Sequence, residues 1–388
     1  MKALRQYLDK IKPKFEPGGK LHAFQSIFDG LETFLYVPNT TSKAGTHIHD
    51  SIDSKRIMSM VVIAALPALL FGMYNVGYQN YAAAGHLADA GFFDLFFFGF
   101  LAVLPKVVIS YAVGLGIEFA WAQWKHEEIQ EGFLVTGILI PLIIPVSCPL
   151  WILVLAVAFS VVICKEIFGG TGMNIFNVAL CARAFLFFSY PSKMTGDTVW
   201  VASNSILGFG YDLPDGFTAA TPLGEIGVGA NVPYSLSDMI TGFIPGSVGE
   251  TSVIAIGIGA IILLWTGIAS WRTMGSVFGG GILMALLFKH LGMTSIDWYE
   301  HIVLGGFCFG AVFMATDPVT SARTHTGQWI YGFLIGAMAL IIRVMNPGYP
   351  EGMMLAILFA NMFAPLIDYY VVQANISKRM KRLTKNNK

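Results

Sequence analysis

The feature of this sequence that most restricts its fold is a succession of long apolar runs, the first beginning near Ile57 and the last ending near residue 373. Each run holds about 20 residues, which is the length that an α-helix needs to cross a hydrocarbon core of roughly 30 Å. Charged residues make up only 12% of the chain, whereas about a quarter is usual for soluble domains. Since only helices and closed barrels satisfy every backbone hydrogen bond inside a bilayer, we expect an all-α polytopic membrane protein.

We expect about ten transmembrane helices in two five-helix halves, because that is the number of apolar runs of spanning length. The runs lie near 57–78, 93–122, 132–147, 150–168, 173–190, 252–270, 273–291, 299–316, 328–345 and 352–373. They are framed by an N-terminal arm (1–56), a central polar segment (191–251) and a C-terminal tail (374–388), so that the two blocks of helices cover 57–190 and 252–373. Prolines and glycines interrupt several runs, and such breaks survive in a bilayer where the freed backbone lines a cavity or a ligand. The pattern therefore predicts a transporter-like core.

The distribution of charge predicts the topology. The arm and the tail are rich in lysine and arginine, whereas residues 191–250 hold six acidic residues against a single base, Lys193. By the positive-inside bias, both termini are expected in the cytoplasm and the polar segment outside. Acidic and basic residues balance at 24 each, so net charge gives no reason to expect binding to nucleic acid.

Several polar residues fall where hydrocarbon would not tolerate them without a partner. Glu118 and Asp368 are carboxylates at membrane depth, and such groups are by default candidates for cation handling, unless they lie close enough to the interface to be wet. Asn174 and Asn177 stand one turn apart after a glycine-rich break. Two amides on one face suit the edge of a heterocycle such as a flavin, and hydrogen bonding between helices is an equally open interpretation.

The arm, the cysteines and the central polar segment each allow a plain interpretation. The aromatic residues Phe24, Phe28 and Phe34 suit either an interfacial helix on lipid headgroups or a lid over a hydrophobic ligand. The four cysteines form no Cys-x-x-Cys pair and are expected to be packing residues, so no metal site is predicted. The stretch 215–222, Asp-Gly-Phe-Thr-Ala-Ala-Thr-Pro, is by itself a turn. No strand-borne Gly-x-Gly-x-x-Gly is present, so this chain is not expected to bind a nicotinamide cofactor.

A set of motifs distributed along the chain resembles one family of membrane proteins. The motifs are Phe-Glu-Pro-Gly-Gly-Lys (15–20), Lys-Glu-Ile-Phe-Gly-Gly-Thr-Gly (165–172), Arg-Ala-Phe-Leu-Phe-Phe (183–188), Phe-Met-Ala-Thr-Asp-Pro-Val (313–319) and Tyr-Pro-Glu-Gly-Met-Met-Leu (349–355). Together they resemble the B-type subunits of sodium-translocating NADH:quinone oxidoreductases, which are inner-membrane complexes of bacterial respiratory chains, over nearly the whole sequence. The D-type subunits of Rnf complexes share the membrane core but typically lack the basic arm, and are the weaker match.

The resemblance implies two flavins. In the family, FMN is joined through its phosphate to a threonine in an Asp-x-x-Ser/Thr-Gly-Ala-Thr motif, which Asp215, Thr218, Ala220 and Thr221 match, with Ala219 in place of the usual glycine. Thr221 is then the acceptor, loaded by a separate flavin transferase. The second flavin, a noncovalent riboflavin, is expected within the membrane part, and our candidates for its pocket are Gly170, Asn174 and Asn177.

The resemblance also implies partners and a reaction. Five other subunits (A, C, D, E and F types) complete the complex, and electrons from NADH enter through another of them, pass to FMN and riboflavin, and reduce ubiquinone while Na⁺ is exported. The quinone site is expected near Gly114, where Leu115 replaces the second glycine of the family's pair, with Phe24, Phe28 and Phe34 as its lid. Glu118 and Asp368 would then line the sodium path, because hard cations prefer oxygen ligands.

Two readings from other functional classes stay open at this point. A cofactor-free channel or carrier for small solutes would explain the interrupted helices but not the Thr221 motif. An assembly scaffold, whose polar residues dock other subunits, would also need no cofactor. A flavin absorbance spectrum separates both from the redox reading.

Overall fold

The computed structural model describes residues 2–16, 18–19, 21–36, 41–42, 44–48, 52–125, 132–214, 217–227, 234–346, 348 and 351–386. Helices dominate these residues, and the only β-type pairing among them is an isolated bridge between Ile206 and Phe209. The prediction of an all-α protein is therefore confirmed.

Within the described ranges, six helical stretches are long and apolar enough to cross a membrane. They are α3 (Ser54–Ala83), α4 (Phe92–Lys125), α6 (Leu150–Cys164) with its 3₁₀ extension to Phe168, α12 (Trp271–His290), α15 (His325–Met345) and α16 (Met353–Asn386). Their length and composition show that this is a membrane protein.

The other expected spans are shorter or broken. Three apolar helices have only 11 to 13 residues, namely α5 (Phe133–Ile143), α7 (Val178–Ser189) and α11 (Val253–Trp265). The expected span 299–316 consists of α13 (Trp298–Val303), α14 (Phe307–Phe309) and a π-helical turn (Gly310–Met314). The break falls at Gly305, whose φ of +68° does not fit a right-handed helix. A count of ten full spans is thus not established by these helices.

The short helix α5 shows how an interrupted helix is satisfied. It ends at Ile143, ahead of Pro145, and the segment that leads into α11 packs against its last turn. The backbone N–H of Gly249 donates to the carbonyl of Leu142 (2.8 Å), and the Ser247 hydroxyl donates to the carbonyl of Ile143 (3.3 Å). Carbonyls freed by the helix end are therefore bonded by protein, as the low polarity of a bilayer requires.

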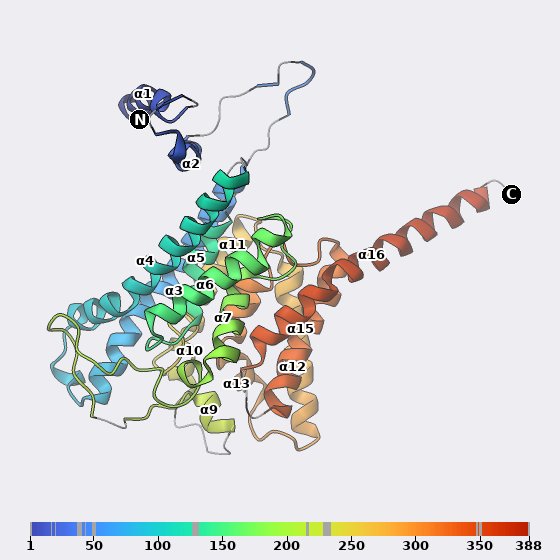
Figure 1. Ribbon diagram of the computed structural model, residues 1–388. Helices are drawn as coiled ribbons and strands as arrows, with labels where there is room; N and C mark the ends of the chain where they lie inside the picture. The colour runs from blue at the N-terminus through green and yellow to red at the C-terminus, as the bar shows by residue number, and fades with distance from the viewer. Residues whose placement is uncertain are drawn as a thin grey trace.

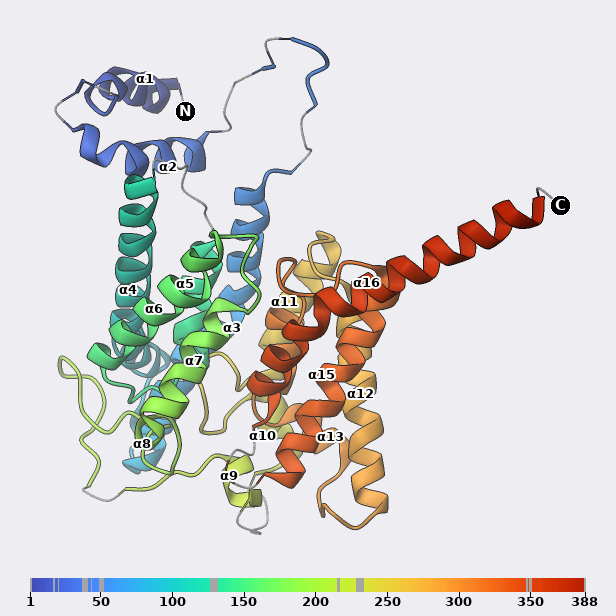
Figure 2. The ribbon, with the colours of Figure 1, turned by 45° about the vertical axis from the view of Figure 1, so that its right-hand side comes forward.

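The helices form one bundle with two distinct ends, shown in Figures 1 and 2. Helix α3 packs against α4 and α11, α12 packs against α15, and α15 packs against α16. At one end, which we call the arm end, the helices α1 (Lys2–Ile11) and α2 (Gln25–Leu35) lie above the end of α4. At the opposite end, the loop end, lie α9 (Pro222–Gly227), α10 (Leu236–Thr241) and α13. The last turns of α16 project from the bundle near the arm end (Figure 2).

Candidate functional site

The first candidate site is a cavity at the loop end, with about 1250 Å³ of space between its walls, part of it open to the outside. Its walls come from α7, from residues 194–200, from the start of α9, and from residues 244–251, with Glu351 from the turn before α16. We call it the loop-end cavity. It is lined by the hydroxyl-bearing Thr221 and by two large aromatic side chains, Phe187 and Trp200.

Thr221 is held at the wall of this cavity by the helix that follows it. Its hydroxyl oxygen accepts a hydrogen bond from the backbone N–H of Gly224 (3.1 Å), which is the geometry of a helix N-cap at α9. Pro222 takes the first position of that helix, where its missing N–H costs nothing. As the acceptor in this bond, the hydroxyl keeps its own proton available.

The rest of the predicted motif lies beside Thr221 in a neighbouring, more open hollow of about 1210 Å³. Thr218 and Ala220 line that hollow, and the backbone N–H of Ala219 donates to the carbonyl of Asp197 (2.7 Å). Asp197 borders both spaces. Asp215 lies outside the described residues, so its prediction is untested.

The floor of the loop-end cavity carries a buried ionic cluster that the sequence interpretation missed. Arg183 on α7 donates from one guanidinium nitrogen to Glu250 (2.6 Å) and from the other to Glu351. Arg183 and Glu250 are only 5% and 7% exposed. Burial raises the pKa of the Glu250 carboxyl to about 7, although the neighbouring guanidinium acts in the opposite direction.

The signal for this cluster was present but dispersed. Arg183 stands in an apolar run, and Glu250 and Glu351 each stand immediately before one. Ionisable groups inside an apolar run or next to one suggest pairing, but only the fold tells which of them meet. The fold also explains Gly306, because a β-carbon there would come within 2.6 Å of an oxygen of each glutamate.

A second candidate site lies at the arm end, where about 760 Å³ of partly open space is enclosed by the starts of α3, α5 and α7 and by residues 316–319. We call it the arm-end cavity. Asn174 and Asn177 both line it, together with Asp317. Their spacing predicted one face of a helix, but α7 begins at Val178, so that Asn174 lies before the helix and Asn177 at its N-cap. Gly170, the third predicted residue, is not among its lining residues; it sits in the turn behind, with φ of +87° and its N–H bonded to the carbonyl of Lys165 (3.1 Å).

Both asparagines are already engaged in the protein's own hydrogen bonds. The Asn177 side chain accepts from the N–H of Leu180 (3.2 Å), capping α7, and donates to Asp317 (3.3 Å). The Asn174 side chain donates to the carbonyl of Phe176 (3.0 Å). In contrast, the buried hydroxyl of Thr171 on the same wall has no hydrogen-bond partner among the described residues.

Glu118, predicted as a carboxylate at membrane depth, is neutralised by a lysine. It forms an ion pair with Lys165, and the two side chains are only 4% and 3% exposed. Lys165 in turn lines the arm-end cavity. The second carboxylate oxygen of Glu118 has no hydrogen-bond partner within the described part of the chain. The pair therefore places one unsatisfied acceptor just behind the cavity wall.

Asp368 lies elsewhere and has a structural role. Its carboxylate accepts hydrogen bonds from the N–H of Arg323 (2.7 Å), the N–H of Thr324 (3.0 Å) and the hydroxyl of Thr324 (2.5 Å). These bonds fix the turn from which α15 starts. Glu118 and Asp368 line neither of the two cavities, so the structure does not bring them into one site.

The residues predicted for a quinone site are also separated. Phe24 is exposed (51%), whereas Phe28 is buried and stacks on Phe15 with ring centroids 4.7 Å apart. The side chain of Phe34 lies outside the described residues. Gly114 packs against the ring of Phe133, about 16 Å along α4 from its end at the arm.

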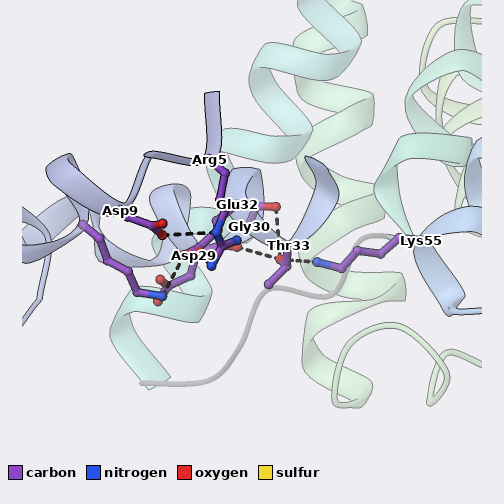
Figure 3. A network of polar contacts seen from close by, with 8 residues as sticks. Arg5, Asp9, Asp29, Gly30, Glu32, Thr33 and Lys55 are labelled. Atoms are coloured by element: carbon purple, nitrogen blue, oxygen red, sulfur yellow. Dashed lines mark hydrogen bonds and ion pairs between the residues drawn. The ribbon is translucent and has the colours of Figure 1, made fainter. Parts of the chain in front are cut away.

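The arm is held together by a small ionic network (Figure 3). The buried carboxylate of Glu32 receives Arg5 (3.1 Å) and Lys12 (2.9 Å), and its hydrogen bond raises the pKa of Lys12. Lys55, at the start of α3, donates to the hydroxyl of Thr33 on α2. This bond ties the arm to the first membrane helix.

Comparison with known proteins supplies the family. A sequence profile described as the NQR2, RnfD, RnfE family matches residues 41–377. A protein of Chromohalobacter salexigens, named as the B-type subunit of Na⁺-translocating NADH-quinone reductase, is 47% identical, over 98% of this chain and 96% of its own length. Proteins of the same name from Ectopseudomonas mendocina and Klebsiella pneumoniae are 45% and 44% identical, over 98% of this chain and 99% of their own lengths. This chain therefore belongs to the NQR2, RnfD, RnfE family.

Proposed function

We propose that this chain is the flavin-carrying membrane subunit of a Na⁺-translocating NADH:quinone reductase. The proposal is supported by relatives of that name that match it over nearly their whole length. The observation that carries it is the hydroxyl of Thr221 at the wall of a cavity with aromatic sides. A D-type subunit of an Rnf complex is the alternative within the same family, and the resemblance of the arm favours the first reading.

The loop-end cavity fits an FMN attached to Thr221. Its partly open space lies between α7, residues 194–200 and residues 244–251, directly beside the attachment hydroxyl. Phe187 and Trp200 offer flat apolar surface to an aromatic ring system. The attachment hydroxyl lies in the same wall, so that a phosphoester at Thr221 would leave the ring system free to enter the cavity.

The protein's own part in the reaction is then to hold and surround the cofactor. Bound FMN would supply one- and two-electron transfer. Thr221 would hold its phosphate, Phe187 and Trp200 would pack against its ring, and the cluster of Arg183, Glu250 and Glu351 would set the charge of the cavity wall. A covalent link prevents loss of the cofactor from a cavity that is partly open.

A riboflavin in the arm-end cavity belongs to the same proposal. The cavity places the side chains of Asn174 and Asp317 on its wall, beside the buried and unsatisfied hydroxyl of Thr171. Because both amide atoms of Asn174 and both of Asn177 are used within the protein, we assign these two residues to shaping the pocket. The two flavins would then lie toward opposite ends of the bundle.

We further propose that the arm end faces the cytoplasm of a bacterial cell and the loop end the outside, with ten membrane-crossing segments in two halves and ubiquinone reduced near the arm. Sodium would be the transported ion. Glu118 could bind it only when the ammonium of Lys165 moves away, because each charge now neutralises the other. Asp368 would contribute to the path only if its bonds to the turn before α15 opened.

The experiment that tests the flavin assignment is fluorescence of the denatured chain in a gel, after expression with an active flavin transferase. We expect the wild type and a Thr195→Val variant to fluoresce under ultraviolet light and a Thr221→Val variant to be dark. Thr195 is the matched control because it is a threonine that lines the same cavity but lies outside the motif. A dark wild-type band would contradict the proposal and bring the solute-channel reading forward.

A further inference from the structure

Among the described residues, the last part of α16 is exposed on all sides. Every side chain from Val372 to Thr384 is exposed, whereas Val371, just before them, is half-buried. Figures 1 and 2 show these turns leaving the bundle as a projecting rod. A helix of this length gains little stability by itself in water, because most helical stability in proteins comes from packing of an apolar face. We therefore expect the rod to pack against something outside the chain.

One face of the rod is apolar. Tyr369, Val372, Ile376, Met380 and Leu383 follow one another at intervals of three and four residues, which places them in a single stripe. We call them the C-terminal stripe. All five are large and exposed, and Met380 and Leu383 are 59% and 60% exposed.

The opposite face is strongly basic. At about 100° per residue, Lys378, Lys381 and Arg382 fall on the side away from the C-terminal stripe, and Arg379 falls on its flank. No acidic residue follows Asp368 in the sequence. The rod therefore combines an apolar stripe with an uncompensated positive face.

The level at which the stripe begins relates it to the bilayer surface. Asp368, one residue before the stripe, binds the turn from which the membrane helix α15 starts. The stripe thus begins level with the first turn of a neighbouring membrane helix, at the arm end of the bundle. From there the rod runs outward, to the side of the bundle, in both views.

We propose that residues 369–386 lie on the bilayer surface at the arm end and bind anionic phospholipid. The C-terminal stripe enters the boundary between headgroups and acyl chains, and the basic residues bind the phosphates. Charge complementarity selects this occupant, because a neutral apolar groove on a protein would leave the basic side chains without partners. The proposal rests on the membrane helices and is independent of the flavin assignment.

The test uses the full chain in bilayers with a fluorescent bimane label at Met380→Cys. The matched control is Ala374→Cys, which is nearby on the same rod but on the face away from the stripe. The four native cysteines are buried, and the chain without an introduced cysteine gives the background. Phospholipids with brominated acyl chains quench the label only when it lies within the hydrocarbon boundary.

In brominated phosphatidylglycerol we expect the fluorescence at position 380 to fall by about half, and that at position 374 to change little. Changing Lys378, Arg379, Lys381 and Arg382 together to glutamine should reduce the quenching at 380 at least about twofold. Equal quenching at both positions, or none at 380, would overturn the proposal. The proposal would also be overturned if brominated lipid did not quench the label at 380 while, in the assembled complex, other subunits shielded that label from iodide. The stripe would then bind a protein.

Discussion

Replacing Arg183 by methionine is the most informative single test of the cluster beneath the loop-end cavity. The change removes the cation that pairs with Glu250 and Glu351 and puts an unbranched apolar side chain in its place. Arg183 is 5% exposed, so water does not replace the lost guanidinium without rearrangement. Breaking a buried ion pair in this way costs about 3–5 kcal/mol, because a buried charge is left uncompensated.

The stability lost in the variant should depend on pH, and the pKa of the Glu250 carboxyl sets the direction of that dependence. Burial raises the pKa of Glu250 from its usual 4.5 to about 7 with Arg183 present, and without the guanidinium it rises further. A carboxyl with a raised pKa in the folded state is ionised more readily in the unfolded chain, so stability falls as pH rises above 4.5 through the folded pKa. The deficit of the variant should therefore be large at about pH 8 and small near pH 5.

The measurement is the melting temperature in detergent, followed by intrinsic tryptophan fluorescence. Both proteins are compared in a Thr221→Val background, so that an attached cofactor does not contribute to stability. We expect a loss of about 5–10 °C at about pH 8. Adding Glu250→Gln to the variant should recover part of it, since one of the uncompensated charges is removed. A variant that melts like its parent at alkaline pH, or a deficit that does not change with pH, would refute the reasoning.

The remaining predictions concern single positions. Gly114→Ala should lower the free energy of unfolding by about 1–3 kcal/mol, because the added methyl group collides with the buried ring of Phe133. Gly116→Ala is its control, since a β-carbon at this position meets open space, and it should be neutral or slightly stabilising. Equal effects of the two changes in thermal melts would contradict this prediction. Asp368→Ala should cost about 1 kcal/mol, because it removes the acceptor that holds the turn and the N-cap residue Thr324 before α15, and Asp368→Asn should be milder. A loss of sodium transport without any loss of stability would instead favour an ion-path role. Asn80→Ala should make residues 202–211 more susceptible to limited proteolysis, because the buried Asn80 side chain forms hydrogen bonds with the backbone of Ala202 and Tyr211, at the two ends of this segment. An unchanged rate of cleavage would contradict this role of Asn80.

The sequence was most informative about the membrane helices. Apolar runs of spanning length identified α3, α4, α12, α15 and α16, because the hydropathy of a run reports how well its side chains are accommodated in hydrocarbon. The sequence was less informative for 299–316, where the composition is mostly apolar but the chain turns at Gly305. Hydropathy does not distinguish a continuous helix from a broken one, since both bury apolar side chains.

Local motifs were less informative than the apolar runs. The spacing of Asn174 and Asn177 predicts one face of a helix, but α7 begins only at Val178, so that Asn174 lies before the helix and Asn177 at its N-cap, although both line the same cavity. The stretch 215–222 predicts a turn that Pro222 closes, whereas Pro222 is the first residue of α9 and Thr221 caps that helix. The roles proposed for these residues stay predictions.

By itself, the sequence determined an all-α membrane protein and the family to which it belongs. The tertiary structure decided the pairings. Arg183 reaches Glu250 across 67 residues and Glu351 across 168, and Lys165 reaches Glu118 across 47. No local pattern encodes which buried charges meet, because every charge in an apolar setting needs a partner and several candidates would serve equally well. Only the packing of the helices selects among them, and it brings the Arg183 cluster beneath Thr221.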